Sequence, residues 1–210
     1  MAFLTSEFIE LRPFAYHVTD RASLPRLQRD GCIRPTAELL AATGREDLLR
    51  TRRRNPVRLS VAGEVVVLKD QTPLLEANTL LTGGWSFGDF VECLNRRVFF
   101  WPGTPHGPIG PGKNLLKHYE SEGPAVLRVP TRQLLEVNAG VEPLYCAFNS
   151  GSPRCQHGER VPRGPDLFTT ADRFSRRASQ VVELVFAAAV LLPPSSLIRD
   201  GDTWQRLFMA

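Results

Sequence analysis

The chain has 210 residues, of which 42% are hydrophobic and 23% charged. These values are ordinary for a folded protein and exclude global disorder, and the length suits one domain over residues 1–210. No apolar stretch reaches the roughly 18 residues of a membrane-spanning helix, and the first residues lack the basic and apolar parts of a signal peptide. We therefore expect a cytoplasmic protein without a membrane partner.

The stretch from Phe14 to Leu40 begins with aromatic and β-branched residues that predict a strand over Phe14–Thr19. Asp20 stands at an N-cap position, and apolar spacing then predicts a helix that ends at Gly31. A second helix is expected to follow, with Thr36 as its cap. His17 lies near the end of the strand, where rigid backbone can hold its ring toward a cleft.

The segment from Gly44 to Arg58 is polar and strongly basic, in a chain of net charge +4. Its run Arg52–Arg54 is either a solvated loop or a phosphate-binding face, because the guanidinium fork matches phosphate oxygens. Two strands, Val57–Ser60 and Glu64–Leu68, are then predicted to form a hairpin at Ala62-Gly63. Asp70 and Gln71 follow as site residues or as turn caps.

An amphipathic helix is predicted over Trp85–Leu94, followed by a central strand over residues 95–102. Alternation along this strand places Phe99 and Trp101 on one side and Phe100 on the other, without indicating which side faces a cleft.

The next loop, Gly107–Asn114, nearly matches the phosphate-binding pattern GxxxxGK[ST]. Asn114 replaces the hydroxyl residue that would bind magnesium, and two prolines remove N–H donors that such a loop needs. We therefore read it as the end of a strand and the start of a helix over residues 113–122, which carries Tyr119.

Further along, the sequence predicts a strand over Ala125–Val129, a helix over Thr131–Val137, an extended stretch over Val141–Phe148 and short closing strands near residues 187–192 and 197–198. The residues between Cys155 and Asp166 are expected to form a mobile loop over a site.

A strand over residues 180–186 contains Glu183 within an apolar run, and buried carboxylates are rare unless they are paired or functional.

The cysteines show no zinc-knuckle spacing, and Cys155 with His157 lacks a second ligand pair, so we expect no metal site and reduced thiols. The alternation of short strands and helices, followed by more strands, favours an α+β fold. No GxGxxG motif follows the first strand, so any NAD site is not of the Rossmann type.

The order of a histidine strand at Tyr16–Thr19, an aromatic strand at residues 98–101 and a glutamate strand around Glu183 resembles ADP-ribosyltransferase-fold proteins. The likeness is to bacterial DNA-targeting toxins of the DarT type and to a related bacterial domain family. It implies a split, mixed or antiparallel β core flanked by helices, with Glu183 as the catalytic residue. The residues implied to bind NAD are His17, Thr19, Arg53, Phe99, Phe100 and Tyr119.

The resemblance implies an NAD-dependent transferase that breaks the nicotinamide–ribose bond. Val181 stands where arginine-modifying members carry Glu or Gln, which argues against a protein-arginine acceptor. The arginine clusters favour single-stranded nucleic acid or a base-like acceptor. An NAD glycohydrolase, a transferase acting on small molecules and a non-catalytic NAD- or nucleic-acid-binding module remain open, as does a toxin with an antitoxin or immunity partner.

Overall fold

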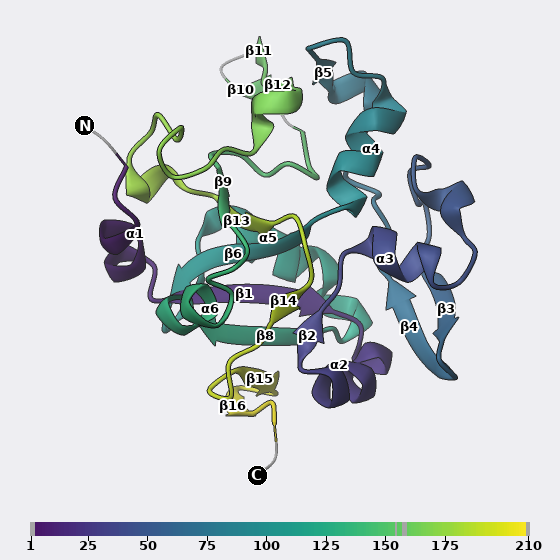
Figure 1. Ribbon diagram of the computed structural model, residues 1–210, viewed down its shortest axis with the longest axis vertical. Coiled ribbons are helices and arrows are strands. Elements are labelled where there is room, and N and C mark those ends of the chain that lie inside the picture. Colours follow the sequence, from purple (N-terminus) through teal and green to yellow (C-terminus); the bar gives the residue numbers. More distant parts are fainter. Residues whose placement is uncertain (1–2, 154, 157–158, 209–210) are drawn as a thin grey trace.

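The computed structural model describes residues 3–153, 155–156 and 159–208. The chain has an α+β fold, in which helices surround a main sheet whose strand pairs are antiparallel (Figure 1). The sheet has the order β16-β15-β8-β1-β6-β13-β9, with β7 beside β6. Its strands are β1 (Phe14–Thr19), β6 (Val98–Thr104), β7 (Gly107–Pro108), β8 (Ala125–Pro130), β9 (Leu144–Cys146), β13 (Glu183–Phe186), β15 (Leu197–Asp200) and β16 (Thr203–Arg206).

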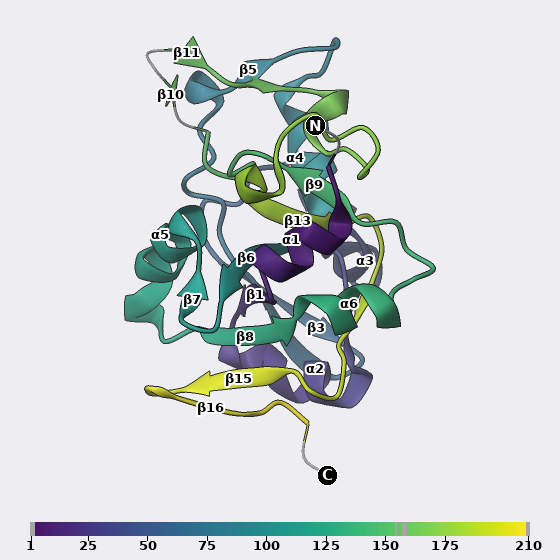
Figure 2. The same cartoon turned by 90° about the vertical axis from the view of Figure 1, so that its left-hand side faces the viewer.

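Helices lie on both faces of this sheet, and Figure 2 shows α5 and α6 on opposite sides of it. Leu134 of α6 joins the largest core cluster, which also contains Ala15, Phe100 and Phe186. The α-helices are α1 (Thr5–Leu11), α2 (Leu24–Asp30), α3 (Thr36–Ala41), α4 (Phe87–Asn95), α5 (Gly110–Tyr119) and α6 (Thr131–Val137). Every helix in the described ranges is too short or too polar to span a lipid bilayer.

The first strand and the helix after it follow the predicted local signals. The Asp20 side chain accepts a hydrogen bond from the Ala22 N–H at 2.9 Å and caps the short 3-10 turn Arg21–Ser23 that leads into α2. Gly31 ends α2 in the left-handed conformation, with φ of 64°. Thr36 was predicted as a cap, but it is the first residue of α3 and Pro35 holds the cap position without a side-chain bond.

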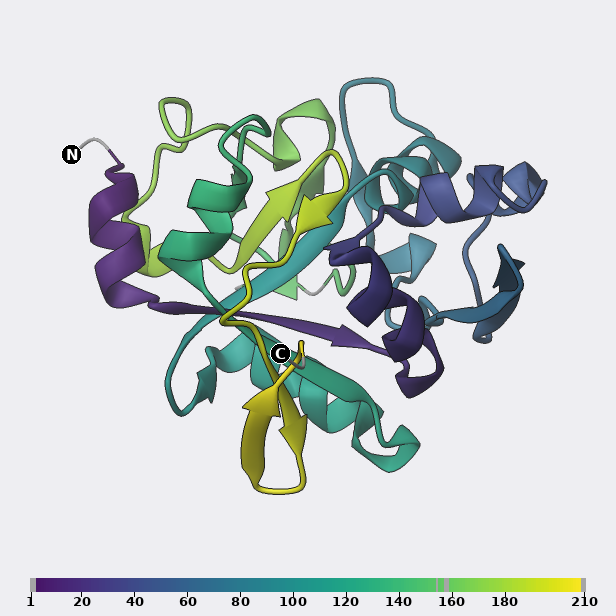
Figure 3. The same ribbon diagram turned by 60° about the horizontal axis from the view of Figure 1, so that its bottom comes forward.

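A hairpin of β3 (Val57–Val61) and β4 (Glu64–Leu68) stands beside α2 and α3, away from the main sheet (Figure 3). Its turn contains Ala62 and Gly63, both at positive φ, as a tight two-residue hairpin turn requires. Leu40 of α3 packs on the inner face of the hairpin in a separate small core. The predicted hairpin is therefore confirmed.

Helix α4 begins with a capping box, in which Ser86 and Asp89 satisfy each other's backbone N–H groups. The predicted central strand at residues 95–102 is shifted, because Asn95 ends α4 and β6 begins at Val98 and extends to Thr104. Asn95 is buried and is held by side-chain hydrogen bonds, which favours the helix end over the strand.

The loop that resembles a phosphate-binding motif is a packing feature. Helix α5 begins at Gly110 rather than at Lys113, and continues through Tyr119 before the 3-10 turn Glu120–Glu122. A Cβ atom on Gly112 would lie 2.8 Å from Cβ of Trp101, so glycine lets α5 lie directly against β6. The close packing of α5 on β6 therefore explains the glycine at position 112 without a bound phosphate.

Short strands tie the remaining segments together. The pairs are β2 (Cys32–Ile33) with β14 (Val190–Leu191), β5 (Leu80–Leu81) with β12 (Pro162–Arg163), and β10 (Cys155–Gln156) with β11 (Glu159–Arg160). The strand predicted over residues 180–186 begins only at Glu183, because residues 178–180 form a 3-10 turn. Further 3-10 turns cover Glu46–Leu48, Glu76–Asn78 and Pro165–Leu167.

The main sheet opens at its centre. Strand β1 pairs with β8 along its whole length, but it pairs with β6 only over residues 14–16, opposite residues 101–103. The other half of β6, residues 98–100, pairs with β13 instead. The two strands therefore separate after Tyr16, and the end of β1 that carries His17 and Thr19 borders an opening.

Candidate active site

A cavity of about 300 Å³ lies at this opening. That volume is at the lower end of the range for small-molecule sites. The cavity is bounded by β1, β4, the start of β6, the end of α5 and the segment Asn149–Ser152 that follows β9. Its lining includes every predicted site residue except Phe100, namely His17, Thr19, Arg53, Phe99, Tyr119 and Glu183. Residues from five separate segments of the chain therefore meet at one cavity.

Glu183 is the first residue of β13 and is only 1% exposed. Its Oε1 accepts a hydrogen bond from the Ser150 N–H at 3.1 Å, while Oε2 has no partner among the described residues. Burial raises the pKa of this carboxyl to about 7, although hydrogen bonding from Ser150 and the charge of Arg163 lower it. Glu183 can therefore exchange a proton near neutral pH, as a general base requires.

His17 lines the same cavity as Glu183 and lies at the point where β1 leaves β6. Its Nδ1 is 2.9 Å from the Phe99 carbonyl oxygen. Burial lowers the pKa of His17, so the ring is neutral at pH 7, and the carbonyl partner requires the hydrogen to be on Nδ1. Nε2 is then left as a hydrogen-bond acceptor, which suits a hydroxyl donor.

The aromatic residues of β6 divide between the two faces of the sheet, as alternation predicts. Phe99 and Trp101 line the cavity, whereas Phe100 is fully buried and packs edge-on against Phe186. The expectation that Phe100 contacts a ligand is therefore corrected, because it faces the main core. Trp101 lines the cavity, and its indole N–H is buried without a partner among the described residues.

Arg53 is the member of the run Arg52–Arg54 that borders the cavity. It is 8% exposed, and its Nη1 donates to Oδ1 of Asn95 at 2.8 Å while its Nε donates to the Lys69 carbonyl at 3.0 Å. Burial lowers its pKa to about 10, so it remains charged at neutral pH. Gln71 belongs to the same hydrogen-bond network, because its Oε1 accepts a hydrogen bond from the backbone N–H of Arg53.

Tyr119 closes the wall that α5 provides. Its hydroxyl donates to the Asp70 carbonyl at 3.2 Å, and the Lys69 ammonium lies 4.8 Å from the ring centroid. Lys69 also forms an ion pair with Glu122 at 2.5 Å. Tyr119 is therefore a packed wall residue with one ring face next to a cation. Asp70 caps a turn, since its Oδ1 accepts from the Thr72 N–H.

Many of the other arginines are paired with acids or carbonyls. Arg45 bonds Asp47, Arg50 bonds Asp89 and Glu92, and Arg173 bonds Asp166. Arg52 donates to the carbonyls of Gln71 and Thr72. The basic stretch is thus partly neutralised, which reduces the positive field expected from the sequence alone.

Sequence reasoning missed three features of the site: the Trp101 N–H, the Ser150 N–H and the buried Arg163. Arg163 donates to the Asn149 carbonyl at 3.2 Å and so supports the segment that bonds Glu183. This arginine lies in the predicted loop at residues 155–166. Strand β12, near the end of that loop, pairs with β5. His157, and with it the rejected Cys155–His157 metal pair, lies outside the described residues, as does Arg154.

Comparison with known proteins gives one result. No curated protein and no solved structure matches the chain significantly. One family model matches residues 13–193, from the residue before β1 to just beyond β14, and this range contains every residue that lines the cavity. The chain therefore belongs to DUF7002, a family of unknown function.

Proposed function

We propose that the chain is an NAD-dependent ADP-ribosyltransferase with an ADP-ribosyltransferase-like fold. The observation that carries the proposal is the meeting of His17, Phe99 and Glu183 at one cavity. These residues come from β1, β6 and β13, three strands that lie far apart in the sequence and side by side in the sheet. The sequence pattern alone predicts these three residues as a site, so their meeting at one cavity supports the chemistry that the pattern implies.

Several residues that line the cavity are of types suited to the parts of NAD. Trp101 and Glu183 line the cavity, and each has one buried polar atom without a partner among the described residues. The flat ring of Phe99 suits stacking on a cationic heterocycle. Arg53 supplies a fixed charge for a pyrophosphate, and His17 Nε2 accepts from a ribose hydroxyl.

Bound NAD would supply the glycosidic bond that breaks, with nicotinamide leaving together with the bonding electron pair. Positive charge then grows on the ribose, and the ionised Glu183 carboxylate stabilises it. The acceptor's oxygen or nitrogen forms the new bond to the anomeric carbon and gives its proton to Glu183. With a pKa of about 7, this carboxyl is substantially ionised at neutral pH and can still hold the proton.

We propose a nucleic acid or a base-like molecule as the acceptor. Val181, which is fully buried, offers no hydrogen bond to a guanidinium acceptor. The exposed Arg54 and Arg177 leave cations at the surface. Backbone binding would weaken steeply between about 50 and 200 mM salt, whereas a site that neutralises one pyrophosphate would respond far less.

The decisive experiment is incubation of the chain with NAD labelled in the adenosine part. Release of nicotinamide together with label on single-stranded DNA or RNA is the expected result. Free labelled ADP-ribose without any labelled acceptor would identify an NAD glycohydrolase. If no nicotinamide is released and NAD does not bind by calorimetry, the proposal is wrong.

A further inference from the structure

A second cavity, of about 460 Å³, lies directly beside the first. The two cavities share the lining residues Asn149 and Ser152, together with Pro73 and Leu115. The second cavity also reaches Val182, the residue before Glu183. A molecule bound there would sit next to the segment whose Ser150 N–H bonds the Glu183 carboxyl.

The wall of this cavity contains a buried arginine with no carboxylate partner. Arg163 is 2% exposed, and its Nη atoms donate to the carbonyls of Val161, Pro162 and Asn149. Among the described side chains no carboxylate lies within ion-pair distance of it, and its Nε–H has no acceptor. Glu183 acts on Arg163 only electrostatically at longer range, without a direct ion pair, so an anionic ligand that bonds the guanidinium would offset more of the cost of burying this cation.

The remaining walls suit an anion attached to a flat group. Asn114 and His118 of α5 and Thr72 supply polar atoms, while Phe148 supplies an aromatic ring. Two guanidinium groups, those of Arg163 and Arg176, lie 5.5 and 4.7 Å from the centroid of that ring. Two cations therefore lie next to this aromatic ring, and Arg163 is the one that lines the cavity.

We propose that the second cavity binds an anionic oxygen group of the acceptor, such as a phosphate ester, through Arg163. That the bound anion belongs to the acceptor rests on the proposed function, which places the transfer at Glu183 in the adjoining cavity. An ester held by Arg163 would bring the rest of its molecule to the wall formed by Asn149–Ser152. Anion binding itself requires no NAD and can be measured separately.

The test titrates the full chain with phenyl phosphate by calorimetry, with phenol as the uncharged match. Phenyl phosphate should bind and phenol should not, and Arg163→Met should weaken phenyl phosphate at least tenfold, the effect of losing a charge-assisted contact. Because Arg163 is buried, its loss could also disturb folding. Asn114→Trp, at an exposed position of α5, fills the second cavity from its mouth and should likewise abolish binding.

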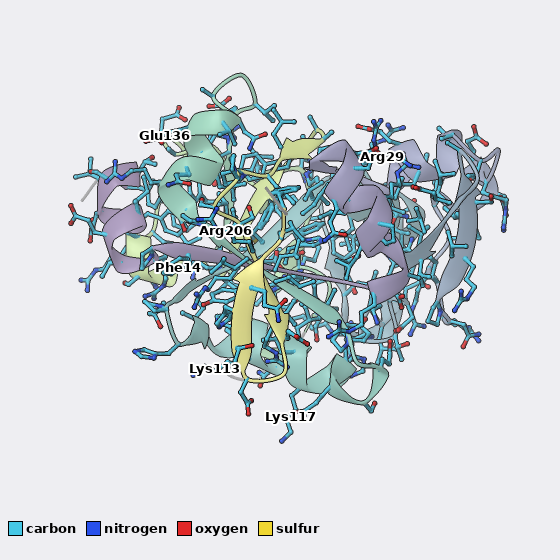
Figure 4. The ribbon with its side chains drawn as sticks, turned by 90° about the horizontal axis from the view of Figure 1, so that it is seen from below. Phe14, Arg29, Lys113, Lys117, Glu136 and Arg206 are labelled. Carbon is cyan, nitrogen blue, oxygen red and sulfur yellow. The ribbon has the colours of Figure 1, made fainter. Side chains whose placement is uncertain are left out.

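The matched control is Lys117→Trp. Lys117 projects from the outer side of α5, as Figure 4 shows, and lines neither cavity, so phenyl phosphate affinity should stay within about twofold. Competition by a short oligothymidylate would assign the anion to a nucleic-acid backbone, and failure to compete would assign it to a small phosphorylated acceptor. The proposal is overturned if phenyl phosphate does not bind, or if Asn114→Trp leaves its affinity unchanged. If the chain binds phenyl phosphate but neither binds NAD nor releases nicotinamide, the proposed function is refuted and the anion site stands.

Discussion

Replacing Glu183 with glutamine should make the protein more stable at alkaline pH while removing its activity. The native pKa is about 7, against 4.5 for an unperturbed glutamate. Between these values the native state keeps a proton that the unfolded chain has lost. The free energy of unfolding must therefore fall as the pH rises through this window. Each pH unit between the two pKa values removes about 1.4 kcal/mol, so the free energy of unfolding is lower by about 3 kcal/mol at pH 8 than near pH 4.5.

Glutamine has no titrating proton, so Glu183→Gln should lack this fall. Its amide oxygen can still accept from the Ser150 N–H, which keeps the local geometry. We expect urea unfolding to give similar stabilities near pH 5 and a variant that is more stable by about 3 kcal/mol at pH 8. Nicotinamide release above about pH 7, where the parent carboxyl is ionised, should drop about 10²- to 10⁴-fold, the usual contribution of a catalytic acid or base.

Glu136→Gln is the control, because Glu136 lies on the outer side of α6, as seen in Figure 4. Its stability profile should follow that of the parent from pH 5 to 8. If the profile of Glu183→Gln also runs parallel to that of the parent, the carboxyl does not titrate as a buried group and the reasoning fails. Activity within threefold of the parent would separately remove Glu183 from the mechanism.

Three further results are expected. His17→Ala should weaken NAD binding by about 1–2 kcal/mol in calorimetry, the scale of a lost hydrogen bond with its desolvated partner. The control His106→Ala, at an exposed position, should leave NAD affinity unchanged. Equal affinities of His17→Ala and the parent would make His17 a structural residue. Phe100→Ala should lower the free energy of unfolding by about 3–5 kcal/mol. Phe99→Ala should chiefly raise KM for NAD. The reverse pattern would contradict the placement of Phe100 in the core and Phe99 at the cavity. The kcat/KM for nicotinamide release should rise with pH to a plateau above about pH 7, because only ionised Glu183 acts as a base; a flat profile from pH 5.5 to 8.5 would argue against this.

Features that depend on neighbouring residues could be predicted from the sequence. The strand Phe14–Thr19, the Asp20 cap and the left-handed Gly31 each follow from side chains within a few positions, and all three are confirmed. The alternation of β6 likewise separated Phe99 from Phe100. What alternation cannot indicate is which face meets the cavity, because this depends on the strands that pair on either side.

The parts that could not be predicted depend on contacts between distant segments. The bond from Ser150 to Glu183 joins residues 33 positions apart, and that from Arg53 to Asn95 spans 42. The run Arg52–Arg54 has no periodicity that would mark Arg53 as the buried one. The sequence excludes a phosphate loop around Gly112 through Asn114 and two prolines, but it does not reveal that α5 lies against Trp101 at this glycine.

The position of β1 in the sheet has a consequence for synthesis on the ribosome. This strand comes early in the chain, yet its two partners are completed only when residues 104 and 130 have been made. Until then an aromatic, β-prone segment stays unpaired on both edges, a state that favours aggregation. Contacts of such long sequence separation also slow folding. Nascent chains arrested before residue 125 should therefore remain bound to chaperones, and release should coincide with the emergence of β8.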